Sequence, residues 1–275
     1  MIRFTRQEPA LSFNEGRQTA FEALRDTLAE LMGSPDVSEI FFRDRWLSRM
    51  AQTGKVFQDG WYSPPPHGAA VLFDSRLNFD SLRNPNNWSG EDRICWKSGL
   101  LYAYASPVNR SDGRMGDLSV TLYFGEERKQ KDHIRNCHDA AVELFRRMDS
   151  ASTAGDLFRL SQEIFSAYRL RSNVISRTDT MPINLGHTFE RLPYPPDAAL
   201  TETDRAFLSG NRRFLNDAAE WTFEPGVQFT VEPQLVSTED ASLPKVTQHY
   251  LVQAGMDGFT VCDDIDGILS VYGLI

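Results

Sequence analysis

Two short segments of this chain carry the side chains best suited to chemistry. The stretch 226–233, Gly-Val-Gln-Phe-Thr-Val-Glu-Pro, is a short β-type run that ends in Glu232 and then Pro233. Because proline disfavours helical backbone in the residue before it, we expect Glu232 in an extended segment. Gly186-His187, 45 residues earlier, offers an imidazole beside a residue without a side chain. A histidine and a carboxylate are the parts of a metal centre or of an acid–base site.

Composition narrows the class of protein. The chain has 275 residues, 41% of them hydrophobic and 24% charged, as in a globular protein with a substantial core. A net charge of −9 argues against nucleic acid as a partner. No apolar run approaches the roughly 18 residues of a membrane helix, and residues 1–6 lack the apolar core of a signal peptide. Three cysteines without CxxC spacing indicate reduced thiols and a cytoplasmic location.

Hydrophobic periodicity predicts a mixed α+β chain. Helices are expected over 14–32, 38–54, 133–148 and 153–168, and a polar helix over 203–219. Strands over 100–105 and 118–124 flank the loop 109–116, which is typical of a hairpin, and residues 245–275 alternate as antiparallel strands do. We expect His133 and His138 to be solvated or incidental. Without a linker or a repeat, the chain is predicted to be one α+β domain over 1–275, with helices on one face of an antiparallel sheet.

Three motifs resemble the pita-bread family of methionine aminopeptidase, aminopeptidase P, prolidase and creatinase. Pro66-His67-Gly68 resembles the His-Gly of the family's catalytic histidine, and residues 116–121 resemble its strand whose aspartate, here Asp117, bridges two metals. Gly186-His187 with the Phe-Thr-Val-Glu-Pro of residues 229–233 is similar to the family's C-terminal signature. The resemblance covers about residues 15–270. It implies a curved antiparallel sheet with helices on one face, and a catalytic domain without the N-terminal domain of creatinase and prolidase.

Departures from the family pattern carry as much information as the matches. Ser106 stands where the family has a first aspartate, and Gln248 stands where it has its last glutamate. The second histidine that follows Gly-His in the family has no counterpart in residues 188–193. Two divalent ions repel each other and need carboxylates to offset their charge, so a dinuclear site is not expected here.

The resemblance therefore leaves two kinds of centre open. Asp117, His187 and Glu232 could hold a single Zn²⁺, Mn²⁺ or Fe²⁺ ion. His249 could add a ligand only if its strand shifted register by one residue, which we do not expect. In the alternative, which follows creatinase, there is no metal: His67 is the general acid/base, and His187 and Glu232 orient the substrate.

Three functions follow from these centres. The first is a divergent hydrolase-like enzyme that acts on a small C–N bond of the amide or amidine type in a small-molecule substrate, and not a true aminopeptidase. The second is a binding module, a pseudoenzyme that kept the fold and lost catalysis. The third is a biosynthetic enzyme that uses a mononuclear metal for non-hydrolytic chemistry. Symmetric association is common for chains of this size, so a homodimer is the expected assembly.

Overall fold

The structure is a computed structural model, and it describes residues 14–62, 68–79, 81–172, 178–194, 196 and 198–275. His67 lies outside the described residues, so its predicted role stays a prediction. The chain divides into two compact units, each of which is described by itself. The N-terminal unit takes the described part of Pro9–Glu126 together with Phe189–Arg212, and the C-terminal unit takes Glu127–Thr188 with Arg213–Ile275. The prediction of one domain over 1–275 stays a prediction.

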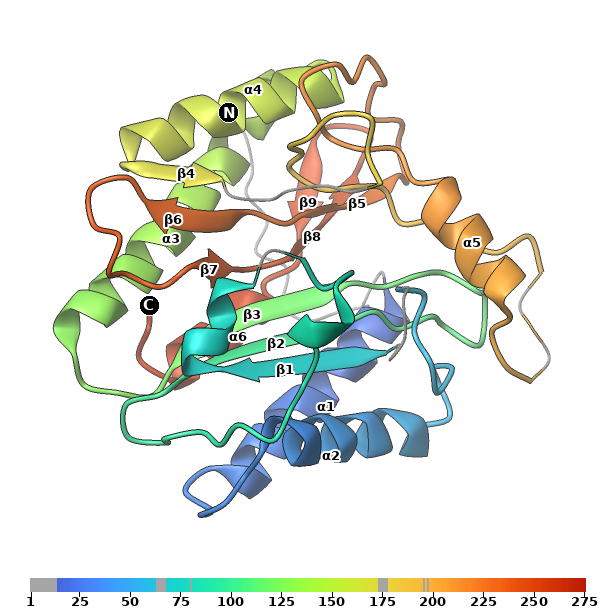
Figure 1. The fold of residues 1–275 in the computed structure, drawn as a ribbon. Helices are drawn as coiled ribbons and strands as arrows, with labels where there is room; N and C mark the ends of the chain where they lie inside the picture. Colours follow the sequence, from blue (N-terminus) through green and yellow to red (C-terminus); the bar gives the residue numbers. More distant parts are fainter. Residues whose placement is uncertain (1–13, 63–67, 80, 173–177, 195, 197) are drawn as a thin grey trace. The chain divides into compact units, whose positions relative to one another are not determined.

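The N-terminal unit is built on one antiparallel sheet. Its order is β1-β2-β3, and Leu100 lies opposite Tyr123 in the β2–β3 hairpin, as the sequence predicts. The helices α1 and α2 pack against this sheet, and the short helical turn η1 packs against β1 and β2 (Figure 1). The elements of this unit are α1 (Glu15–Leu31), α2 (Glu39–Gln52), β1 (Ala69–Phe73), η1 (Asp74–Asn78), η2 (Pro85–Asn87), β2 (Leu100–Ala105), β3 (Leu118–Tyr123) and α5 (Glu202–Gly210).

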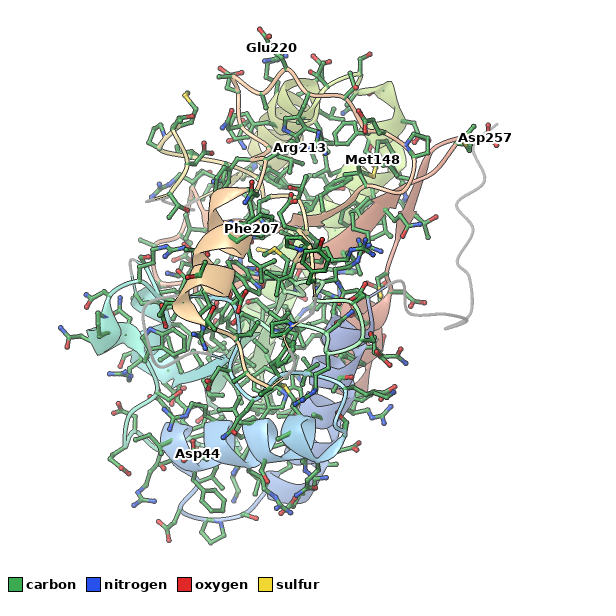
Figure 2. The ribbon with its side chains drawn as sticks, turned by 90° about the vertical axis from the view of Figure 1, so that its right-hand side faces the viewer. Asp44, Met148, Phe207, Arg213, Glu220 and Asp257 are labelled. Atoms are coloured by element: carbon green, nitrogen blue, oxygen red, sulfur yellow. The ribbon has the colours of Figure 1, made fainter. Side chains whose placement is uncertain are left out.

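The C-terminal unit contains two antiparallel sheets and two long helices that pack against each other. The sheets have the orders β4-β6-β7 and β5-β8-β9, and α4 packs on β4 and on α3. Asp257 lies at the tip of the β8–β9 hairpin (Figure 2). The elements of this unit are α3 (Arg128–Arg147), η3 (Met148–Ser150), α4 (Ala154–Ala167), β4 (Leu170–Ser172), β5 (Gln228–Val231), β6 (Gln234–Ser237), β7 (Val246–Thr247), β8 (Tyr250–Ala254), β9 (Phe259–Val261) and α6 (Asp264–Val271).

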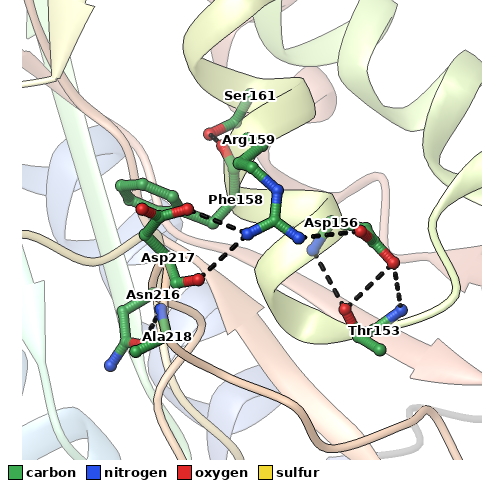
Figure 3. A network of polar contacts seen from close by, with 8 residues as sticks. All are labelled: Thr153, Asp156, Phe158, Arg159, Ser161, Asn216, Asp217 and Ala218. Carbon is green, nitrogen blue, oxygen red and sulfur yellow. Dashed lines mark hydrogen bonds and ion pairs between the residues drawn. The ribbon is translucent and has the colours of Figure 1, made fainter.

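Capping residues fix where the helices begin. The Asn14 side chain accepts a hydrogen bond from the backbone of Arg17 at 2.9 Å, and Ser38 caps α2 in the same way. Thr153 and Asp156 form a reciprocal capping box at the start of α4 (Figure 3). Each cap satisfies backbone N–H groups that the first helical turn leaves without partners. The predicted starts of α1, α2 and α4 are therefore confirmed to within a residue.

Two predicted elements are wrong. The helix expected over 203–219 ends at Gly210. The residues after it run beside the 185–188 segment instead, where the N–H of Leu215 donates to the carbonyl of Gly186 at 2.9 Å. The predicted strand pattern at the C-terminus ends in a helix, α6, which buries Ile265, Ile268 and Leu269 at spacings of three and four.

The two histidines of α3 also differ from expectation. His133 and His138 are each only 5% exposed, so neither is solvated. His133 Nε2 lies 2.9 Å from the carbonyl oxygen of Pro244, and His138 Nδ1 lies 3.1 Å from the hydroxyl of Tyr250. Both imidazoles therefore join α3 to the 244–250 segment. None of the helices in the described ranges combines the length and apolar character that crossing a bilayer requires.

Candidate functional site

The histidine of the Gly-His pair lies in a segment that backbone hydrogen bonds hold in place. Glu232 donates its N–H to the carbonyl of Leu185, and Thr230 donates to the carbonyl of His187, both at 2.8 Å. On its other side, His187 pairs with Phe214 in an isolated bridge, and the two rings meet edge to face at 6.2 Å. His187 and Glu232 are therefore brought together by one run of backbone pairing, as the two motifs predicted.

Gly186 is required by how closely this segment approaches its neighbour. Its φ of 156° lies at the edge of the region that favours glycine. A Cβ atom at this position would lie 1.9 Å from the carbonyl oxygen of Thr230. The absence of a side chain thus allows the chain of His187 to lie directly against the β5 end that carries Glu232.

The hydrogen bond of one ring nitrogen fixes the tautomer of His187. Its Nδ1 lies 3.0 Å from the carbonyl oxygen of Thr188, which can only accept, so Nδ1 carries a proton. In the neutral imidazole Nε2 then presents a lone pair, and this atom lies 3.9 Å from Glu232 Oε2. A proton or a cation placed between these two groups would interact favourably with both. His187 is 2% exposed, and burial strengthens such an interaction.

A second imidazole faces the same carboxylate. His249 Nδ1 lies 3.7 Å from Glu232 Oε2. The pairs Val231↔Tyr250 and Gln234↔Thr247 are in phase, so Glu232 and His249 stand opposite each other across the two chains without any shift of register. The expectation that His249 would face away from the site is therefore wrong. The sequence could not reveal this, because the pairing of two distant segments decides which face each residue takes.

Gln248, at the position where the resemblance places a glutamate, lies with Tyr250 instead. The Tyr250 hydroxyl donates to Gln248 Oε1 at 2.5 Å, and the same hydroxyl lies 3.1 Å from His138 Nδ1 on α3. Alternate residues of an extended chain share a face, so Gln248 and Tyr250 lie opposite to His249. The carboxamide is thereby committed to a hydrogen-bonded chain that leads to α3.

The remaining predicted residues belong to the N-terminal unit. Asp117 is buried, 1% exposed, directly before β3, and the guanidinium of Arg17 donates to its backbone carbonyl. Ser106 takes part in local structure: its N–H donates to the carbonyl of Gly68 at 2.8 Å, and its hydroxyl approaches the same oxygen at 3.4 Å. A Cβ at Gly60 would lie 2.2 Å from this hydroxyl, so the surroundings of Ser106 are tight.

The donor set of the C-terminal unit decides which ions it suits. Glu232 is a hard oxygen ligand, while His187 and His249 are borderline nitrogen ligands, a mixture typical of Zn²⁺ and Fe²⁺ sites and not of Mg²⁺ or Ca²⁺ sites. The side chain of Glu232 is 14% exposed, which leaves the centre in contact with solvent. Of these residues, Glu232 and His249 place their ligand atoms close enough together to fit one divalent ion of the first transition series.

Comparison with solved structures shows the fold. The chain is similar to X-Pro aminopeptidase from Thermotoga maritima, with a TM-score of 0.59 and 10% identity over 90% of this chain and 58% of that one. The chain is also similar to prolidase from Pyrococcus furiosus, with a TM-score of 0.56 and 14% identity over 90% of this chain and 62% of the prolidase. For methionine aminopeptidase from Rickettsia prowazekii the TM-score is 0.57, with 12% identity over 89% of this chain and 94% of the aminopeptidase. The chain thus has the pita-bread α+β fold of these peptidases, as the motifs implied.

The likeness is one of fold, and its coverage differs between relatives. The chain spans 58 to 62% of the length of the X-Pro aminopeptidase and the prolidase. No protein-family profile matches the sequence, and no curated protein is similar to it at the sequence level. The three short motifs of the sequence were therefore the signal that led to this fold.

Proposed function

We propose that this protein is a hydrolase-like enzyme that cleaves a small C–N bond, of the amide or amidine type, at the centre formed by His187 and Glu232. The observation that carries the proposal is the pairing of Nε2 and Oε2 at 3.9 Å, with Nδ1 tied to the carbonyl of Thr188. A buried base and a carboxylate held in fixed orientation are suited to moving a proton to and from a bound substrate.

Glu232 is the proton carrier in this scheme. Its carboxylate accepts a proton from the water whose oxygen bonds to the substrate carbon. The C–N bond then breaks, and Glu232 returns the proton to the departing nitrogen. His187 orients a substrate N–H group, which donates to the lone pair of Nε2. The resemblance adds Asp117 as a further ligand and His67 as a general acid/base, and both stay parts of the proposal.

The centre admits a version with one divalent ion and a version without. When bound, an ion would polarise the substrate and lower the pKa of a water molecule. In the metal-free version a second proton on His187 Nε2 takes the place of that positive charge. Elemental analysis of the purified protein and of His187→Ala separates the two, because equal metal content in both proteins contradicts the metal version.

Turnover of a library of small amides and amidines tests the function itself. We expect Glu232→Gln and His187→Ala each to lower kcat/KM by at least about 100-fold, the lower end of what general acid–base groups contribute. His133→Ala is the matched control, because His133 is a buried histidine of the same unit that bonds the carbonyl of Pro244. Wild-type turnover in the Glu232→Gln variant, or turnover lost equally in the control, contradicts the proposal.

A second candidate is a binding module without catalysis. It is favoured by the engagement of Ser106 and Gln248 in hydrogen bonds with Gly68 and Tyr250, because both positions carry metal-binding carboxylates in the family resemblance. The net charge of −9 then favours a partner with a basic surface. Association with such a partner that persists in Glu232→Gln, together with no turnover across the library, supports this candidate over the enzyme.

A further inference from the structure

The strand that carries Gln248 and His249 presents different chemistry on its two faces. On one face, the Gln248 carboxamide and the Tyr250 hydroxyl are joined at 2.5 Å and continue to His138 on α3. His138 Nε2 in turn lies 3.6 Å from Asp266 Oδ1 on α6. On the other face, His249 Nδ1 lies 3.7 Å from Glu232. The histidine, and not the glutamine, is thus directed at the centre.

Hydrogen-bond polarity shows that Gln248 is fixed in this orientation. Its Oε1 can only accept, so Tyr250 must be the donor. The same hydroxyl then accepts from His138, which places a proton on Nδ1. Gln248 is 2% exposed, and its Nε2 has no hydrogen-bond partner in the described part of the chain. Turning the Gln248 carboxamide toward Glu232 would break its hydrogen bond with Tyr250.

Distances at the centre fit an ion better than direct contacts. The separations of 3.7 and 3.9 Å from Glu232 Oε2 to the two ring nitrogens are too long for hydrogen bonds. Two ligand atoms that each lie about 2.0–2.2 Å from one ion are about 3–4 Å apart. Glu232 and His249 stand at such a separation, and their ligand atoms lie close enough to share an ion.

We propose that His249 is a metal ligand that takes over the place of the missing glutamate, so that Glu232 and His249 bind one divalent ion. The inference rests on the centre of the proposed function and adds a ligand to it. A neutral imidazole brings no negative charge, and the single carboxylate of this set offsets one ion only. This donor set favours Zn²⁺, Fe²⁺ and Co²⁺ over Mg²⁺ and Ca²⁺.

Calorimetric titration with Co²⁺, followed by its visible absorption spectrum, tests the inference without any substrate. We expect His249→Ala and His249→Gln each to weaken Co²⁺ binding by at least about 10-fold and to change the spectrum, because a nitrogen ligand is lost. Gln248→Ala is the neighbouring control, expected to stay within about threefold of wild type. Gln248→Glu is also expected to stay within that range, because its new carboxylate faces away from the ion.

Several outcomes overturn the inference. They are the absence of Co²⁺ binding by the wild type, equal affinity in the wild type and both His249 variants, and tighter binding by Gln248→Glu of about 10-fold or more. Circular dichroism of each variant identifies any that fails to fold, and the milder His249→Gln keeps the test open in that case. The titration is independent of turnover: an ion that binds as expected in a protein without amidase activity contradicts the proposed function and leaves this inference standing.

Discussion

Position 186 has room for a hydrogen atom and for little more, because the carbonyl of Thr230 would lie 1.9 Å from any Cβ there. We expect Gly186→Ala to lower the free energy of unfolding by about 1–3 kcal/mol or more, as overpacking does. The same change should weaken metal binding, because the chain of His187 has to move away from Glu232. Urea unfolding and Co²⁺ titration measure the two effects.

Gly267→Ala is the control for that variant. Gly267 lies within α6 of the same unit, with nothing within 4 Å of an added Cβ. Alanine is favoured over glycine in a helix by about 0.5–1 kcal/mol, so this change should leave stability equal or higher. If both variants are equally destabilised, the close approach at Gly186 is not the cause.

His133 should make stability depend on pH. Burial lowers the pKa of His133 below its usual value, although the carbonyl of Pro244 and the charge of Asp240 act in the opposite direction. The unfolded chain, whose histidine has an ordinary pKa of about 6.5, therefore binds more protons in this range than the folded one. The contribution of neutral His133 to the free energy of unfolding is fully present above pH 6.5, and it is lost as the pH falls toward the lowered pKa of this residue.

Replacing His133 with glutamine removes the titrating group. We expect the loss of unfolding free energy between pH 7 and pH 5.5 to be smaller in His133→Gln than in the wild type. Urea unfolding at both pH values measures this difference. An unchanged pH dependence in the variant would show that other groups are responsible.

At the scale of elements, a capping box and an ion pair of unequal strength stabilise the start of α4. Thr153 and Asp156 form the capping box, with the N–H of Asp156 donating to Thr153 Oγ1 at 3.1 Å (Figure 3). Arg159 links the helix to Asp217 at 2.9 Å, but both side chains are more than half exposed. Solvent screens such a pair, so the cap should dominate.

This ranking is testable with two alanine variants. Thr153→Ala should cost about 1 kcal/mol of stability, as the loss of an N-cap does. Arg159→Ala should cost less, within about 0–1 kcal/mol, and its effect should shrink further at high salt. Thermal unfolding at low and high salt checks both; a larger cost for Arg159→Ala would reverse the ranking.

Elements whose signals are local were predictable from the sequence. Asn14, Ser38 and Thr153 cap the three helices that the sequence placed within a residue, because a cap acts on the next three residues only. The predicted helix does not continue beyond Gly210, because residues 213–215 pair with the distant 185–188 segment and residues 219–222 pair with the start of α4. Propensity along the chain carries no information about such partners.

The candidate site was predictable in the same uneven way. His187 and Glu232 stand in short motifs and were found from the sequence. His249 was missed, because only the pairing of β5 with β8 decides whether it or Gln248 faces Glu232. His138 was misjudged for a similar reason: its partner, Tyr250, lies 112 residues away.

At the scale of the whole molecule, the C-terminal unit is assembled from two stretches of chain that the Phe189–Arg212 segment separates. β4 belongs to the first stretch and pairs with β6 of the second, and Leu185 of the first accepts from Glu232 of the second. Neither stretch can complete these pairs alone. The unit therefore depends on contacts between residues that are distant in sequence.

A fragment of residues 213–275 should accordingly be unfolded by itself. It contains β5 and β6 but lacks β4 and the 185–188 segment that pair with them. Buried strands without partners leave backbone polar groups unsatisfied. Far-UV circular dichroism and a urea titration measure this; a cooperative transition in the isolated fragment would contradict it.

The aromatic neighbours of His187 give the C-terminal unit an optical probe of its own. Of the five tryptophans in the chain, Trp221 alone belongs to this unit. Its indole N–H donates to the carbonyl of Phe214 at 2.9 Å, and the Phe214 ring rests against His187. A bound molecule that displaces the His187 imidazole should therefore also affect Trp221, because Phe214 contacts both residues. The fluorescence of Trp221, measured in a variant whose other four tryptophans are replaced by phenylalanine, would report binding at the centre of His187 and Glu232 in real time.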